Sequence, residues 1–314
     1  MAVFKPNKKD LELLEILDKN SRASLREISS QLKISKQAIN KKINNLKKRR
    51  IIKFLPIIDY FKLGYSNTHI YLKLRGIKKE EYGKIIKKLE GENNISWISQ
   101  FFGDFDLGIS IFYKSLKELK KTLKKIYELM GKYIIKEEKI FILKQYIQSF
   151  CINKECKREI IRMELSDEIL NLSTIQKKIL SKIKETGKFN YLNVSLDLKN
   201  KPETIKKHLQ NLERKEVIKK YKVLIDYNKL GYIWSLCHLS IKKGGDISKL
   251  IKILNKEKRI PFISITLEDN IILDFLSKEY SELKSFLEEL KWKNSEIFDY
   301  NILNVDKIFK LKEP

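Results

Sequence analysis

The sequence predicts an α+β fold in which one unit occurs twice, each unit being a winged helix-turn-helix domain followed by a ferredoxin-like βαββαβ domain. Three observations predict it. The segment IIKFLPIIDYFKLGY at residues 51–65 recurs at residues 217–232 as VIKKYKVLIDYNKLGY, with one residue inserted. Apolar residues at helical spacing precede both segments, and alternating strand and helix patterns follow both. The chain is therefore a tandem repeat of one α+β unit.

The repeat divides the chain into five segments. Winged helix-turn-helix domains are predicted at residues 1–63 and 172–230, and α/β sandwich domains at residues 64–150 and 231–314. Residues 151–171 connect the copies, contain neither Pro nor Gly, and predict an ordered connector that is helical after Ser166. Ser173 and Gln176 predict a capping box that opens the next helix.

The first helix-turn-helix follows from its apolar residues. A helix is expected at residues 8–19, and a second at residues 25–32, where Ser24 and Glu27 form a capping box. A turn at residues 33–35 leads into a third helix, and residues 51–59 read as the strand of a wing. The apolar stripes of the second and third helices recur in the other copy; they are Leu25, Ile28, Leu32, Ile39, Ile43 and Leu46, matched by Tyr191, Val194, Leu198, Ile205, Leu209 and Leu212.

The α/β domains follow from alternation. Strands are predicted at residues 68–75, 95–102, 107–113 and 134–148, with helices at 78–93 and 115–130. The second copy repeats this order, with strands at residues 233–241, 262–267, 271–276 and 297–305 and helices at 247–256 and 281–290.

The third helix of the first copy has the profile of a recognition helix. No acidic residue occurs between Glu27 and Asp59. Ser35 is placed as the N-cap, and Gln37 and Asn40 lie on the first exposed turns, where amides can reach base edges. The lysines can contact phosphates; they are Lys36, Lys41, Lys42 and Lys47. The plainer alternative is a three-helix subdomain with a solvated basic face.

The corresponding helix of the second copy differs. Pro202 suits the first helical turn, and Glu203 stands where the first copy has Gln37. Thr204, Lys206 and Lys207 remain usable for DNA contact. We expect this copy to contact DNA more weakly or with another specificity, and a mainly structural second copy is the alternative.

The formal net charge of +26 favours a polyanionic partner such as double-stranded DNA. Lys, Ile and Asn have A/T-rich codons, so composition alone also explains part of the charge. No apolar stretch of about 20 residues predicts a membrane helix, and we expect a cytoplasmic protein. The three cysteines predict reduced thiols and no metal site, and no motif predicts catalysis or a cofactor.

The winged helix-turn-helix, the segment IIDYFKLGY and the turn Gly103-Asp104-Phe105-Asp106 together resemble the Lrp/AsnC family of transcription regulators. Each of the two copies carries this resemblance, and together they span nearly the whole chain. SKQAINKKINNL looks like that family's recognition helix, and GDFDLGISI looks like its effector-domain signature.

The resemblance implies a non-enzymatic, sequence-specific regulator whose α/β domains pair and bind a small-molecule effector such as an amino acid. Gly103, Asp104 and Asp106 are the candidate effector residues, although a tight turn needs the same residue types. The second copy has Glu268-Asp269-Asn270-Ile271 at this place. Two fused copies imply an intramolecular pseudo-dimer, with further homo-oligomerisation left open.

Two alternatives remain at the level of sequence. Siroheme decarboxylases also look like Lrp/AsnC proteins, and an anionic tetrapyrrole would suit Arg75, His69, His238 and Arg259. A non-specific architectural DNA-binding protein would show a steep salt dependence and no preferred site.

Overall fold

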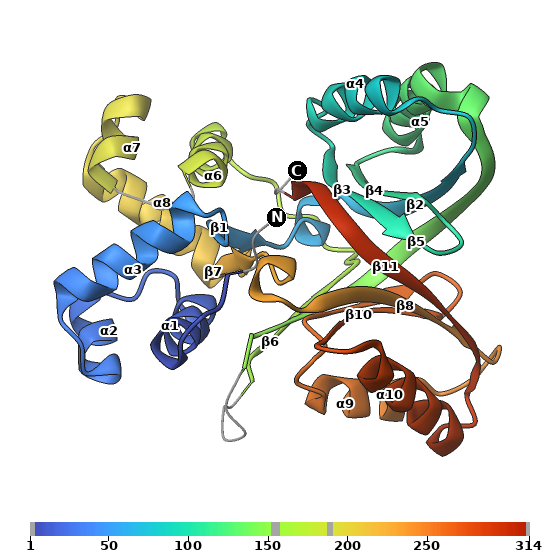
Figure 1. The fold of residues 1–314 in the computed structure, drawn as a ribbon. Helices are drawn as coiled ribbons and strands as arrows, with labels where there is room; N and C mark the ends of the chain where they lie inside the picture. The colour runs from blue at the N-terminus through green and yellow to red at the C-terminus, as the bar shows by residue number, and fades with distance from the viewer. Residues whose placement is uncertain (1–3, 152–157, 187–190, 312–314) are drawn as a thin grey trace. The chain divides into compact units, whose positions relative to one another are not determined.

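A computed structural model describes residues 4–151, 158–186 and 191–311 (Figure 1). The chain forms two compact units that do not follow the tandem order. The helical unit comprises Met1–Leu63, Gln148–Ile161 and Glu168–Tyr232; the barrel unit comprises Gly64–Ile147, Arg162–Asp167 and Ile233–Pro314. Each unit therefore combines equivalent parts of both copies. The divisions after Leu63 and Tyr232 lie at or near the predicted domain limits.

The first half of the helical unit contains helices α1 (Lys8–Lys19), α2 (Leu25–Leu32) and α3 (Lys36–Lys48), followed by strand β1 (Ile52–Ile58). The predicted capping box at Ser24 and Glu27 is present, and a second one, between Asn7 and Asp10, opens α1. The predicted apolar stripes form the buried core of this half except for Leu25, which is exposed at the first turn of α2 because the core lies on the side of Ile28 and Leu32. The buried residues are Leu13, Leu14, Leu17, Ile28, Leu32, Ile39, Ile43 and Leu46.

The second half repeats this arrangement with α6 (Thr174–Thr186), α7 (Tyr191–Leu198), α8 (Pro202–Arg214) and β7 (Ile218–Ile225). Lys33 and Arg50 have positive φ angles of 52° and 54°, and Lys199 and Glu216, each 166 residues later, have 51° and 53°. Few non-glycine residues adopt this conformation, so its recurrence at equivalent positions shows that the two halves share one backbone path.

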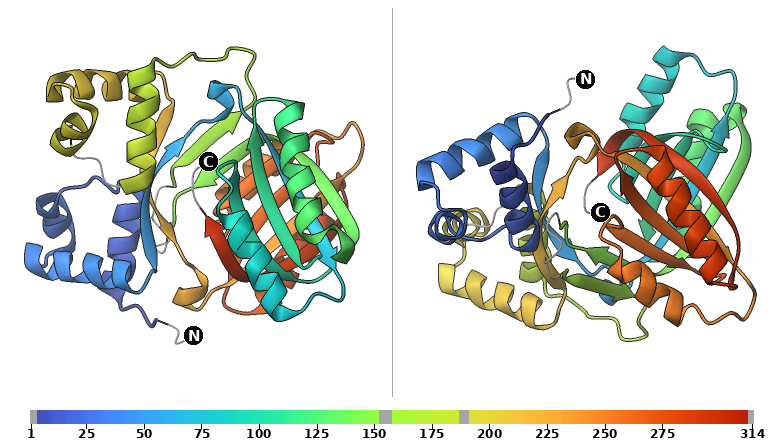
Figure 2. Two further views of the ribbon diagram at one scale, coloured as in Figure 1. Left: turned by 90° about the horizontal axis from the view of Figure 1, so that it is seen from above. Right: turned by 60° about the horizontal axis from the view of Figure 1, so that its bottom comes forward.

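The two halves are joined through their strands. Strand β1 pairs antiparallel with β7, with Ile52 opposite Ile225 and Leu55 opposite Lys222 (Figure 2). Helix α1 packs on β7, and α6 packs on β1. The sequence predicts β1 as a strand but not its partner. Each strand pairs the backbone groups along one of its edges with the strand of the other copy, because a single strand cannot satisfy them alone.

The barrel unit has the predicted βαββαβ order twice. The first copy supplies β2 (Ser66–Leu74), α4 (Lys79–Glu90), β3 (Ile95–Phe102), β4 (Leu107–Tyr113), α5 (Leu116–Met130) and β5 (Ile134–Gln148). The second supplies β8 (Ile233–Ile241), α9 (Ser248–Lys256), β9 (Phe262–Thr266), β10 (Ile271–Ser277), α10 (Tyr280–Lys293) and β11 (Ile297–Leu311).

These eight strands close into one barrel. Their order is β2-β4-β3-β11-β8-β10-β9-β5, and β5 pairs back onto β2. The copies meet twice, where β3 pairs with β11 and β5 pairs with β9. Helices α4 and α5 cover the outer face of the first copy's strands, and α9 and α10 cover that of the second (Figure 1). Closure leaves none of the eight strands with a free edge.

Two expectations for the connector and the cysteines are wrong. No helix follows Ser166 directly: residues Ile160–Glu164 form strand β6, which pairs with β5, and α6 begins at Thr174. Pairing with the edge of β5 decided this conformation. The predicted capping box between Ser173 and Gln176 is present.

Cys151 is disulfide-bonded rather than reduced, and Cys237 is free and buried. Disulfide formation depends on spatial proximity, which the sequence spacing did not reveal.

No helix among the described residues is long and apolar enough to cross a membrane.

Candidate functional site

Helix α3 is positioned by a turn that the local sequence specifies. Lys33 takes the left-handed conformation after α2, and the Ser29 hydroxyl donates to the Ile34 carbonyl oxygen over 2.7 Å. The Ser35 hydroxyl oxygen then accepts from the Ala38 backbone N–H over 3.2 Å, as expected of an N-cap. These contacts fix where the helix begins, and therefore which residues lie on its first exposed turn.

The predicted DNA-contacting residues of α3 lie on its surface, with one exception. Those that are exposed are Ser35, Lys36, Gln37, Asn40, Lys41 and Lys47. Their helix turns its opposite face, made by Ile39, Ile43 and Leu46, into the core. The exposed face carries lysines and amides but no carboxylate, which gives a positively charged helix able to donate to phosphates and base edges.

Lys42 is the exception. Its ammonium lies 2.6 Å from an Asp10 carboxylate oxygen and its side chain is half-buried, so it ties α3 to α1. Asp10 thus pairs with the positive charge of Lys42, which the sequence had predicted to contact phosphate. The sequence could not reveal this pair, because the two residues are far apart along the chain.

Helix α8 presents fewer groups of this kind. Lys206 and Lys207 are exposed and Thr204 is half-buried, so the structure brings the three predicted residues to the accessible side of the helix. The N-cap residue Lys201 makes no side-chain capping hydrogen bond, and Glu203 is exposed in the first turn.

The candidate effector turn at Gly103, Asp104 and Asp106 packs against and hydrogen-bonds to neighbouring strands of the barrel. Gly103 has φ +136°, and a Cβ there would lie 3.0 Å from the Ile302 carbonyl oxygen of β11. Asp106 accepts from the Leu74 backbone N–H over 2.8 Å and from the Lys73 ammonium over 3.0 Å. These contacts show a structural role for Gly103 and Asp106.

Asp104 differs from its neighbours because it is exposed. One carboxylate oxygen accepts from the Asn301 side-chain amide of β11 over 2.8 Å. The turn therefore joins the first copy to the second through this hydrogen bond.

The sequence singled out His69 and His238 for a tetrapyrrole, but it did not reveal the polar and aromatic cluster that surrounds them inside the barrel. Alternate residues of each strand belong to the helix-covered core, so His69, Tyr71, Trp97, His238 and Asp274 face the barrel interior. The Tyr71 and His238 ring centroids are 4.8 Å apart, and the Tyr71 hydroxyl lies 3.4 Å from His69 Nδ1. Strand alternation could have placed each side chain on this face. It could not show that both copies face one interior.

Burial sets the protonation of this cluster. It lowers the pKa of His69 to about 3, with a further contribution from the nearby His238, and lowers the pKa of His238 to about 4. Burial raises the pKa of Asp274 to about 7, against the opposing effect of a hydrogen bond from Trp234. Both histidines are therefore neutral near neutral pH.

Replacing Asp274 by Asn is expected to stabilise the protein at pH 8. The folded-state pKa of Asp274 lies above its ordinary value of 3.8, so this group's contribution to stability is present at low pH and is lost as the pH rises from about 4 to about 7. The amide removes that loss, which amounts to at most about 4 kcal/mol for three pKa units. Urea unfolding of both proteins at pH 4, 6 and 8 measures it. A stability difference that does not change with pH would contradict this assignment. The histidines titrate in both proteins and cancel in the difference.

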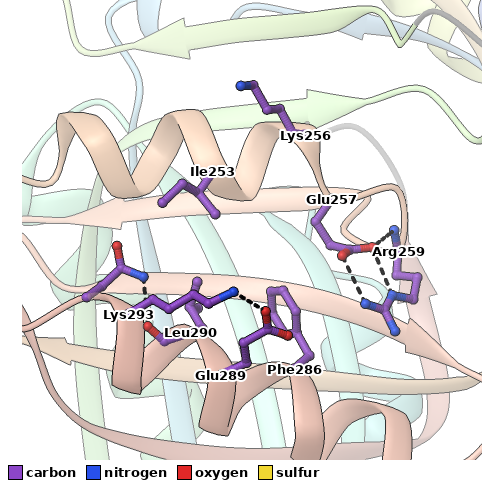
Figure 3. Close-up of a pocket in the computed structure, with 9 residues that line it drawn as sticks. Ile253, Lys256, Glu257, Arg259, Phe286, Glu289, Leu290 and Lys293 are labelled. Atoms are coloured by element: carbon purple, nitrogen blue, oxygen red, sulfur yellow. Dashed lines mark hydrogen bonds and ion pairs between the residues drawn. The ribbon is translucent and has the colours of Figure 1, made fainter.

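Arg75 and Arg259 do not join the two histidines. Arg75 is exposed. Arg259 lines a hollow of about 320 Å³ between α9 and α10, where Glu257 binds its guanidinium over 2.8 and 2.9 Å and Lys293 pairs with Glu289 (Figure 3). Its guanidinium also lies over Phe275, which belongs to the helix-covered core, so Arg259 is outside the barrel interior.

Known proteins resemble this chain at two scales. A sequence profile described as winged helix-turn-helix DNA-binding matches residues 6–53. The HTH-type transcriptional regulator LysM of Sulfurisphaera tokodaii is 32% identical over 123 residues, which are 39% of this chain and 85% of that protein. The HTH-type transcriptional regulator FL11 of Pyrococcus horikoshii is 30% identical over 123 residues, 39% of this chain and 80% of that protein.

Two solved structures of one protein match over almost the full length. The siroheme decarboxylase NirDL covers 98% of this chain and 93% of its own with a TM-score of 0.63, at 15% sequence identity. At this identity the match concerns the fold alone.

The helix-turn-helix geometry and the relatives that span one copy of the repeat lead to the same conclusion, which confirms the resemblance in the sequence: the chain belongs to the Lrp/AsnC family of helix-turn-helix transcriptional regulators.

Proposed function

We propose that the protein is a non-enzymatic regulator that binds double-stranded DNA at specific sites, with α3 in the major groove. Gln37 and Asn40 read base edges, and Lys36, Lys41 and Lys47 contact phosphates. The observation that carries the proposal is the exposed face of α3, which holds amides and lysines and no carboxylate. Lys42 is left out because Asp10 binds it.

The proposal includes a second winged helix-turn-helix formed by α6, α7, α8 and β7. Its backbone repeats the positive-φ residues of the first, and the pairing of β1 with β7 holds both within one unit. One chain then carries the two DNA-binding domains that a dimer of single-copy chains would supply. Further assembly of whole chains remains part of the proposal.

Binding across salt concentrations tests this function. The gene's own upstream region is compared with a scrambled duplex of equal length. A preference of about 10³-fold or more that persists as salt rises supports a site-specific regulator. Equal affinity for both duplexes with a steep salt dependence supports an architectural protein instead. Absence of binding at low salt would contradict both the site-specific and the architectural function.

The double substitution Gln37→Ala with Asn40→Ala is expected to remove most of the site preference. Each bidentate base contact contributes about 1–3 kcal/mol of discrimination, while the lysines that hold the phosphates stay in place. Competition between the preferred and scrambled duplexes measures the loss. A variant that keeps its preference would show that other residues read the bases. Asn44→Ala with Asn45→Ala, two exposed amides further along α3, is the matched control.

A small-molecule effector, such as an amino acid, is proposed at the turn of Gly103, Asp104 and Asp106. Because the carboxylate of Asp106 is bound by Lys73 and Leu74, exposed Asp104 is the group available to an ammonium. DNA binding measured with each amino acid tests the site. Asp104→Asn is the variant expected to lose any response.

A tetrapyrrole-processing enzyme is the second candidate. The likeness to siroheme decarboxylase NirDL and the two neighbouring histidines inside the barrel favour it. The separate locations of Arg75 and Arg259 make it the weaker candidate. A shift in the absorption spectrum of siroheme on mixing, abolished by His69→Ala with His238→Ala, would establish binding. An unchanged spectrum at excess protein would exclude it.

A further inference from the structure

We propose that this protein recognises an asymmetric operator, in which α3 specifies the sequence of one half-site while α8 adds weak contacts that specify none. This inference rests on the proposed function. It predicts that the pseudo-symmetric helical unit does not require a palindromic DNA site. Three differences between structurally equivalent surfaces carry it.

The first difference is at the helix tips. From α2 to Arg50, the shared backbone pairs each residue of the first half with the residue 166 positions later. Lys36 and Gln37 of α3 therefore correspond to Pro202 and Glu203 of α8. Glu203 is exposed, and its carboxylate opposes approach to the phosphate backbone. Pro202 offers no donor at all.

The second difference is the charge along the helices. Helix α3 holds five lysines and no acidic residue, whereas α8 holds three basic and two acidic residues. Of the three proposed phosphate contacts in α3, only Lys41 has a lysine counterpart, which is Lys207.

The counterpart of Lys47 has a structural role. It is Glu213, whose carboxylate accepts from the Arg22 guanidinium over 3.0 Å and from the Tyr221 hydroxyl over 2.8 Å. Lys47 is thus available to contact phosphate in the first half, whereas the equivalent Glu213 binds Arg22 of the first half and so helps to hold the two halves together.

The third difference lies on the helix that precedes each recognition helix. In helix-turn-helix proteins this helix crosses the DNA backbone. Helix α2 exposes Arg26 and Ser30, one turn apart, whereas the equivalent residues of α7, Leu192 and Leu196, have 61% and 77% of their surface exposed. Leucine cannot donate to phosphate.

Selection from a pool of randomised duplexes tests the operator directly. The full-length protein is expected to enrich one half-site motif beside a region of free sequence. Enrichment of an inverted repeat with two equally specified half-sites would overturn the inference while supporting the proposed function. Failure to bind or enrich any sequence would overturn the proposed function itself, so the two failures are distinguishable.

Matched substitutions measure the two helices separately. Lys36→Ala with Lys41→Ala is expected to weaken binding to the selected duplex about 30-fold or more, since it removes two phosphate contacts. Lys206→Ala with Lys207→Ala removes the same charge from α8 and is expected to weaken it less than about 5-fold. Equal losses would overturn the inference. All four side chains are exposed, and unchanged circular dichroism melting curves verify folding.

A graft provides a gain of function. Pro202→Lys, Glu203→Gln and Lys206→Asn together give α8 the residues of Lys36, Gln37 and Asn40. The grafted protein is expected to prefer an inverted repeat of the selected half-site over a single half-site by about 10-fold or more, while the natural protein prefers neither by more than about 3-fold. A natural protein that already prefers the repeat would contradict the asymmetry.

Discussion

Replacing Lys36, Lys41 and Lys47 together by alanine is expected to reduce affinity for duplex DNA about 100-fold at 0.15 M salt. Each lysine is exposed on α3 and contributes one proposed phosphate contact. Each contact releases counterions and adds about 0.9 to the slope of log affinity against log salt, so the slope should fall by about 2.7. Fluorescence anisotropy titrations at several salt concentrations give both quantities.

The slope makes this prediction specific. Lys243→Ala, Lys249→Ala and Lys252→Ala remove the same charge from exposed positions in the barrel unit. If affinity depended only on net charge, both triple variants would lose it equally. The proposed interface predicts a change of slope for the α3 variant and almost none for the control. Similar slopes in the two variants would show that α3 is not the binding surface.

Replacing Asp18 by alanine is expected to destabilise the helical unit by about 3–5 kcal/mol. Asp18 is 2% exposed, accepts from the Phe150 backbone N–H over 2.7 Å and pairs with the Lys222 ammonium over 3.3 Å. Lys222 is 5% exposed and also donates to the Gln148 carbonyl oxygen over 3.1 Å. Alanine leaves a buried ammonium without its counter-ion and a buried N–H without its acceptor.

The pKa shifts indicate that much of the stability lost in Asp18→Ala comes from leaving one charge of the pair unpaired. Burial raises the pKa of Asp18 despite the attraction of Lys222, and burial lowers the pKa of Lys222. The pair therefore contributes little net stability, and removing both charges should cost much less than removing one.

Asp18→Leu with Lys222→Met tests this reasoning. The double variant is expected to recover at least half of the stability that Asp18→Ala loses, measured by urea unfolding. If both proteins were equally destabilised, the ion pair itself would be stabilising. If Asp18→Ala cost less than about 1 kcal/mol, water would be reaching Lys222.

The helices of this protein could be predicted from local sequence. The apolar stripe of Ile39, Ile43 and Leu46 and the cap at Ser35 define α3 within the helix and its first turn. The same reasoning found the cap at Ser24 and, in the other copy, the one at Ser173. Helical hydrogen bonds and caps join residues three or four apart, so the sequence holds the information needed.

The exposed face of α3 was predictable for the same reason, because burying one side of a helix exposes the other. Lys42 was not, because Asp10 lies on a different helix. The interior position of His69 and His238 was also beyond the sequence. Strand alternation assigns each side chain to a face, but it does not identify what that face encloses.

Local sequence specifies the repeat, the element order of each copy and the residues on the exposed face of α3. The pairing of the strands, in contrast, follows only from the three-dimensional fold. Strand β1 pairs with β7, and β11 continues beyond the predicted end at residue 305 to Leu311 because it leaves β8 at Asn304 and pairs with β3 of the other copy. A strand's alternation is encoded locally, but its hydrogen bonds are completed by any strand that the fold brings alongside, and here that strand comes from the other copy.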